Sequence, residues 1–119
     1  MTESPGREPL LVACLCAAWC HTCGDYRATF DTLALEFGAR AIFVWIDIED
    51  HEAALGGVEV DDFPTLLLAA GDELRFHGPV LPHAAVARQM VQRALLGPLG
   101  APSADAALAG LPARLRAIA

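Results

Sequence analysis

The apolar residues of the chain fall into short unbroken runs and one long helical repeat. An apolar run over residues 10–18, LLVACLCAA, and a second over 41–47, AIFVWID, are typical of strands buried on both faces. Between the two runs the apolar positions step by four, three and four up to Gly38, at Tyr26, Phe30, Leu33 and Phe37. This spacing predicts an amphipathic helix of about four turns.

In the second half of the chain, the apolar runs are shorter and predict shorter helices and strands. An acidic stretch holds a short helix around residues 52–55 that ends at two glycines. Residues 65–70 and 74–77 are typical of strands, and Gly71 with Asp72 supplies a two-residue hairpin turn between them. A second long helix is predicted from Pro82 to Gly97, since proline is favoured in the first turn and the apolar positions return at helical spacing.

Composition divides the chain into three regions. We expect a polar N-terminal segment over residues 1–9, an α/β domain over 10–97, and an extension over 98–119 that is rich in alanine and proline. The extension predicts two short helices, around 104–109 and 112–118, or a partly disordered tail, and it could cover a sheet face left exposed.

Size and charge exclude several classes of protein. With 119 residues, 55% of them hydrophobic and 19% charged, the chain has the composition of one globular domain. A net charge of -7 argues against binding to nucleic acid or to an anionic membrane. No apolar run reaches the ~20 residues of a membrane span, and the first residues lack the pattern of a secretory signal, so we expect a cytoplasmic protein.

The four cysteines lie within ten residues of one another, at positions 14, 16, 20 and 23. Structural disulfides usually close long loops, so this clustering indicates a functional site. Cys20 is predicted at the start of a helix, where unpaired N–H groups and the helix dipole favour the nucleophilic thiolate. Cys23 is predicted one turn later, within reach of a mixed disulfide formed on Cys20.

The motif Trp19-Cys20-His21-Thr22-Cys23 after a buried strand, followed at some distance by Phe63-Pro64-Thr65, resembles the thioredoxin family over residues 10–95. The resemblance implies a three-layer α/β sandwich around a four-stranded mixed sheet, lacking the first strand and helix of thioredoxin. It also implies that Pro64 is cis and flanks the dithiol. Phe63 would pair with an extended substrate segment, while Trp19 and Gly78 would line the substrate groove.

The chain departs from the thioredoxin pattern at the active site. His21 and Thr22 replace the usual Gly-Pro between the cysteines, and His21 can add positive charge or a hydrogen bond to the thiolate, which makes the disulfide more oxidising. By the same resemblance Cys14 replaces a buried acid and Trp45 its lysine partner. Removal of the proton from Cys23 then lacks its usual assistant.

The other two cysteines have a simpler interpretation. Cys14 and Cys16 alternate with Ala13 and Leu15 on the first strand, where a free cysteine packs as a small apolar residue. Two alternatives stay open: one of these thiols exchanges with the active-site disulfide, or the cluster and His21 bind a soft metal such as Zn²⁺ or Cu(I).

The resulting hypothesis is an enzyme, a cytoplasmic thiol-disulfide oxidoreductase of cell redox homeostasis that works without a bound cofactor or metal. Cys20 is its nucleophile, Cys23 its resolving thiol, and His21 tunes the pair. Its expected partners are disulfides of other proteins and a redox partner such as a thioredoxin reductase or glutathione. The alternative is a thioredoxin-fold module that binds a partner without catalysis.

Overall fold

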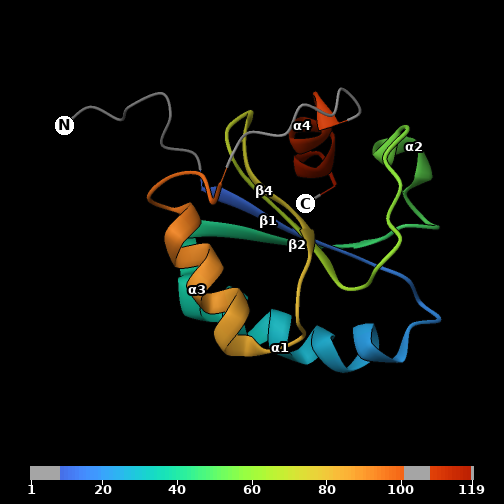
Figure 1. Cartoon of the computed structure of the whole chain (residues 1–119), viewed down its shortest axis with the longest axis horizontal. Helices are drawn as coiled ribbons and strands as arrows, with labels where there is room; N and C mark the ends of the chain where they lie inside the picture. The colour runs from blue at the N-terminus through green and yellow to red at the C-terminus, as the bar shows by residue number, and fades with distance from the viewer. Residues whose placement is uncertain (1–8, 101–107, 119) are drawn as a thin grey trace.

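Four strands form one mixed sheet at the centre of the molecule (Figure 1). We analysed a computed structural model of the chain that describes residues 9–100 and 108–118. The order of the strands across the sheet is β2-β1-β3-β4. The strands are β1 (Leu10–Cys16), β2 (Ala41–Asp47), β3 (Thr65–Ala70) and β4 (Glu73–Pro79).

The strand directions follow from the connections. β1 runs parallel to β2, with Leu10 opposite Ala41, because a helix crosses over between them. β3 is antiparallel to both β1 and β4. The turn from β3 to β4 places Gly71 at φ 59°, a left-handed conformation that favours glycine. The predicted hairpin and the predicted mixed sheet are therefore confirmed.

Helices cover both faces of the sheet (Figure 1). Alternation along β1 decides which residues each face receives. Leu10, Val12, Cys14 and Cys16 belong to the core shared with α1 (His21–Phe37) and α3 (Ala84–Ala94). Leu11, Ala13 and Leu15 belong to the core shared with α2 (Glu52–Leu55) and α4 (Leu111–Arg116). The expected three-layer α/β sandwich is confirmed, and no strand precedes β1 among the described residues.

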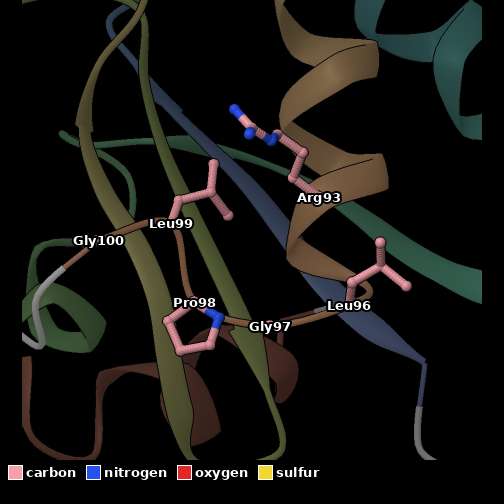
Figure 2. A pocket seen from close by; sticks show the side chains of 6 residues that line it. All are labelled: Arg93, Leu96, Gly97, Pro98, Leu99 and Gly100. Atoms are coloured by element: carbon pink, nitrogen blue, oxygen red, sulfur yellow. The ribbon is translucent and has the colours of Figure 1, made fainter.

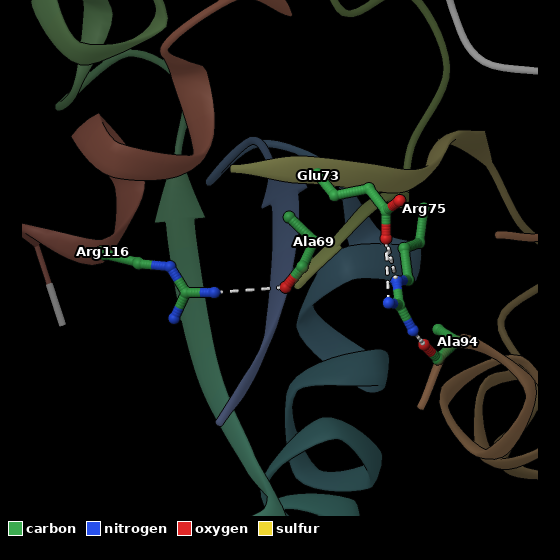
Figure 3. A network of polar contacts seen from close by, with 5 residues as sticks. All are labelled: Ala69, Glu73, Arg75, Ala94 and Arg116. Atoms are coloured by element: carbon green, nitrogen blue, oxygen red, sulfur yellow. Dashed lines mark hydrogen bonds and ion pairs between the residues drawn. The ribbon is translucent and has the colours of Figure 1, made fainter. Parts of the chain in front are cut away.

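Helix α4, from the C-terminal extension, packs on the second face. Leu111 and Leu115 are fully buried there. Arg116 donates from Nη1 to the carbonyl of Pro9 at 3.1 Å. From Nη2 it donates to the carbonyl of Ala69 at 3.2 Å (Figure 3). A helix predicted over 112–118 is thus present, whereas most of the helix predicted around 104–109 and nearly all of the segment 1–9 lie outside the described residues.

On the face covered by α1 and α3, a second arginine connects α3 to the β3–β4 hairpin. Arg75 of β4 donates from Nε to the Glu73 carboxylate at 2.8 Å and from Nη1 to the carbonyl of Ala94 at 2.5 Å (Figure 3). This contact ties the last residue of α3 to the edge strand of the sheet. The charge on Arg75 is thereby paired, and each of its three guanidinium nitrogens has a partner, as expected for a half-buried guanidinium.

Several predicted boundaries were wrong by one to three residues, the largest difference being the end of α3 at Ala94 instead of Gly97. The first strand ends at Cys16 instead of residue 18, because the N–H of Cys20 donates to the carbonyl of Ala17 at 3.0 Å and closes a turn there. Strand β4 is longer than 74–77, since Pro79 still pairs with Thr65. Helix α3 begins after His83, whose backbone is extended, and not at Pro82. Among the described helices, none has both the length and the apolar character that crossing a membrane requires.

Candidate redox site

The site lies where β1 ends and α1 begins. Cys20 is the residue that caps α1, with extended backbone angles of φ -89° and ψ 115°, and its carbonyl accepts the N–H of Gly24 at 3.1 Å. The Cys20 side chain is a free, half-buried thiol packed against the core under α1. His21 is exposed as the first residue of the helix. The predicted nucleophile is therefore reduced, and it is only partly covered by protein.

Cys23, on the first turn of α1, is disulfide-bonded to Cys16 at the end of β1, and their Cα atoms are 5.9 Å apart. Both residues are almost completely buried. The expectation that Cys16 packs as a free apolar residue is wrong. The reason is strand alternation, which turns Cys16 toward the same face that receives the buried side of α1. The predicted exchange between Cys20 and Cys23 stays a prediction.

Cys14 is a buried free thiol beside this disulfide, with its Sγ 3.6 Å from Sγ of Cys16. Because the bonded Cys16 sulfur has no hydrogen, Cys14 is the donor of this contact. Burial raises the pKa of Cys14 from its ordinary 9.0 to about 12, and the nearby charge of Arg27 only partly opposes this. Cys14 therefore remains a neutral thiol at physiological pH.

A cavity of about 320 Å³ opens beside Cys23. Its lining comes from the turn after β1, from α1 and from β2: Ala17, Ala18, Cys23, Gly24, Arg27, Trp45 and Asp47. The guanidinium of Arg27 lies 4.9 Å from the ring centroid of Trp45 and pairs with Asp31 at 3.5 Å. Sequence reasoning missed Arg27, although its place one helical turn after Cys23 is a signal that could have found it.

The predicted substrate-facing residues gather at the same end of the sheet. The rings of Trp19 and Phe63 meet edge to face with centroids 5.3 Å apart, and Trp19 is 65% exposed. The Phe63-Pro64 peptide bond is cis, as the resemblance implied. Gly78 lies on β4 opposite Leu66, two residues before Val80, whose N–H donates to the carbonyl of Pro64 at 3.0 Å.

Two other features of the structure lie apart from this chemistry. Within residues 9–100 and 108–118, no group of three or more His, Cys, Asp or Glu side chains is arranged to hold a metal ion, so the metal alternative stays a prediction. A cavity of about 510 Å³ at the end of α3 is lined by Arg93, Leu96, Gly97, Pro98, Leu99 and Gly100 (Figure 2). None of the predicted site residues lines that second cavity.

The fold and the site define a thioredoxin-fold domain with neighbouring cysteines, two of them joined in a disulfide. The family model described as thioredoxin matches residues 4–90, which is more than half of the chain. The chain therefore belongs to the thioredoxin family. A comparison with curated protein sequences gave no significant match.

Solved structures share this fold at low sequence identity. Thioredoxin from Fasciola hepatica aligns with a TM-score of 0.65 and 20% identity, over 74% of this chain and 83% of that one. Thioredoxin from Trypanosoma brucei brucei aligns with a TM-score of 0.64 and 22% identity, over 76% and 79%. A mutant thioredoxin from Halobacterium salinarum aligns with a TM-score of 0.63 and 23% identity, over 74% and 76%.

Proposed function

We propose that this member of the thioredoxin family is a thiol-disulfide oxidoreductase that acts on disulfides in other proteins. The observation that carries the proposal is the free Cys20 thiol at the start of α1, half-buried and one turn away from the disulfide-bonded Cys23. A thiol at this position combines access for a substrate with the electrostatic stabilisation of its thiolate by the helix.

The proposed reaction is a dithiol exchange. The Cys20 thiolate attacks one sulfur of a substrate disulfide, forms a mixed disulfide and releases the other substrate sulfur as a thiolate. In the reduced protein Cys23 then attacks Cys20, which forms the Cys20–Cys23 disulfide and frees the second substrate thiol. His21, next to the nucleophile, favours the reduced form through its charge or a hydrogen bond.

The proposed substrate is an extended protein segment. Exposed Trp19, which meets the half-buried ring of Phe63 edge to face, offers apolar area next to Cys20. The backbone of Phe63, before cis Pro64, is the partner for strand-like pairing. Gly78 would leave room for the segment on the neighbouring strand. A net charge of -7 disfavours acidic substrates and nucleic acid.

The remaining parts of the proposal concern the cellular setting. We propose a cytoplasmic role in redox homeostasis without a bound cofactor, with a thioredoxin reductase or glutathione as the partner that returns Cys20 and Cys23 to the reduced state. The glutathione poise of the cytosol lies within the range of potentials that C-x-x-C proteins span, so either partner is chemically suitable.

Insulin reduction in the presence of dithiothreitol tests the proposal. Cys20→Ser is expected to lower turbidity development to the rate without protein, because no exposed nucleophile remains. Cys14→Ser is the matched control, since it replaces a buried neutral thiol on the adjacent strand and is expected to keep most of the wild-type rate. Equal rates for Cys20→Ser and the wild type would refute the enzyme hypothesis.

One observation favours the alternative of a non-catalytic binding module. With Cys23 bonded to Cys16, Cys20 has no resolving thiol on the next turn, and a substrate captured by Cys20 would remain attached. A stable mixed disulfide between Cys20 and a target, together with unchanged insulin turbidity in all variants, is the outcome that this alternative predicts.

A further inference from the structure

We propose that Cys16 is a third redox-active cysteine, and that the oxidised protein exchanges its disulfide between a Cys20–Cys23 form and a Cys16–Cys23 form. The proposal rests on the proposed function, because it begins where the dithiol exchange ends. It adds a second oxidised state in which the nucleophile is free again while the protein still holds a disulfide.

The placement of three sulfurs carries this inference. Cys23 is bonded to Cys16 from the strand side, and it lies one helical turn from Cys20 along α1. Cys20 packs against the same core cluster that contains Cys16 and Cys23. Cys23 is therefore shared between two possible partners, one buried at the end of β1 and one at the partly exposed start of α1.

The exchange step is balanced without any external oxidant. The Cys16 thiolate attacks Sγ of Cys23, the Cys16–Cys23 bond forms, and the Cys20–Cys23 bond breaks. Cys20 leaves as a thiolate and takes up the proton that Cys16 lost. The number of disulfides is unchanged, so one thiol and one disulfide remain on these three residues.

Burial determines what each form exposes. In the Cys16–Cys23 form the disulfide is almost inaccessible, with exposed fractions of 1% and 2%, and the free thiol is the half-buried Cys20. In the Cys20–Cys23 form the free thiol would be Cys16, enclosed in the apolar core under α1. The exchange thus moves the disulfide inward and returns the nucleophile to the surface.

The S–H of Cys14 supports the departure of Cys16 in the reverse step. It donates to Sγ of Cys16 at 3.6 Å, and the same donor is available when that sulfur leaves as a thiolate. Burial keeps Cys14 protonated and therefore keeps it a donor. Cys14 thus acts as a positioning residue for Cys16, without forming a bond itself.

Titration of the reduced protein with Ellman's reagent, an aromatic disulfide, tests the exchange without any protein substrate. Cys20 attacks the reagent and Cys23 resolves the mixed disulfide, so each site first releases two coloured thiolates. If Cys16 then forms the disulfide with Cys23, the freed Cys20 reacts with a second molecule of the reagent. We expect about three equivalents from Cys14→Ser and about two from the matched Cys14→Ser/Cys16→Ser double variant.

Mass spectrometry assigns the end product. Chymotryptic cleavage after Trp19 separates Cys16 from Cys20 and Cys23, so a Cys16–Cys23 disulfide joins two fragments and a Cys20–Cys23 disulfide stays within one. We expect joined fragments with the reagent's thiolate on Cys20. Two equivalents from both variants, or the reagent's thiolate on Cys16, would overturn the exchange.

The oxidised Cys20→Ser variant provides an independent measurement. It is expected to form the Cys16–Cys23 disulfide in a glutathione buffer, as the same joined fragments, and failure to form it would also overturn the proposal. Loss of insulin reduction in Cys20→Ser leaves this result untouched. Failure of the proposed function and failure of the exchange are therefore read from different experiments.

Discussion

The two faces of the sheet receive different kinds of side chain from the same strand, β1. On the face under α1 and α3, alternate residues of β1 bring Cys14 and Cys16 next to Cys23, and the core there contains a disulfide and a free thiol. On the other face, the intervening residues of β1 contact α2 and α4, and the core cluster described there consists of aliphatic side chains. Neighbouring residues of β1 therefore point to opposite faces, one lined with cysteines and the other with aliphatic side chains.

The two faces of the sheet draw their residues from different parts of the chain. The cysteine face depends on sulfurs that lie within ten residues of one another in the chain, from Cys14 to Cys23. The inert face is completed by Leu111 and Leu115, which lie near the opposite end of the chain from the strand they cover. Changes on the inert face are therefore expected to affect stability without affecting redox behaviour, whereas changes on the cysteine face can affect both.

The largest expected effect is on the inert face. Leu115→Ala removes a fully buried side chain and is expected to lower the free energy of unfolding by about 2–5 kcal/mol, because it leaves a cavity against the sheet. Urea unfolding measures the loss, and Leu96→Ala, at a residue that is 90% exposed, is the control. A changed Cys20/Cys23 reduction potential in Leu115→Ala would break the separation between the faces.

The next effect concerns the buried thiol of Cys14. The pKa of this thiol is about 12 in the folded protein and 9.0 ordinarily. Between these two pH values the folded protein keeps a proton that the unfolded chain loses. This contribution to stability is complete below pH 9.0 and is lost as the pH rises toward about 12. Each pH unit above 9.0 is expected to cost about 1.4 kcal/mol.

Urea unfolding at about pH 8 and at about pH 11 checks this alkaline loss. The Cys14→Ala variant should lose less stability between the two conditions than the wild type, because its buried site has nothing to titrate. The same slope in both proteins would contradict the assignment of the loss to Cys14.

A smaller effect is expected at the mouth of the site. His21→Pro removes the imidazole that we propose to tune Cys20 and should lower the reduction potential of the Cys20/Cys23 pair by about 30 mV, equivalent to about 1.4 kcal/mol. Equilibration with glutathione and mass spectrometry of the alkylated thiols measures the change. An unchanged or higher potential would show that His21 does not tune the thiolate.

The smallest effect is expected from Tyr26→Phe. The Tyr26 hydroxyl is buried, and it has no hydrogen-bond partner among the residues that the structure describes. Removing it should leave the free energy of unfolding unchanged or raise it by up to about 1 kcal/mol, because the desolvation cost of an unpaired polar group disappears. A loss of more than that amount in thermal or urea unfolding would indicate a partner for the hydroxyl.

Much of the fold could be read from local patterns. The strands at 41–47 and 65–70, the short helix at 52–55 and the glycine turn have the predicted boundaries, because apolar runs and turn residues act over a few positions. The end of β1 and the start of α3 were misplaced, because single hydrogen bonds and one extended residue decide them.

The candidate site was predictable in part. The position of Cys20 at a helix start and the cis Pro64 follow from the motif and the family resemblance. The Cys16–Cys23 bond did not, because the prediction treated Cys16 as a member of the strand and Cys23 as a member of the helix. The interaction of Arg27 with Trp45 likewise joins a helix to a strand through side chains that are far apart in the chain.

By itself, the sequence determined the class of the protein: short apolar runs and the helical spacing of apolar residues select an α/β sandwich, and four clustered cysteines mark its candidate site. Only the tertiary structure decided which cysteine bonds to Cys23 and which helix covers the face of the sheet opposite α1. The physical reason is that periodicity fixes the side to which a residue points, whereas its partner depends on how separate elements pack.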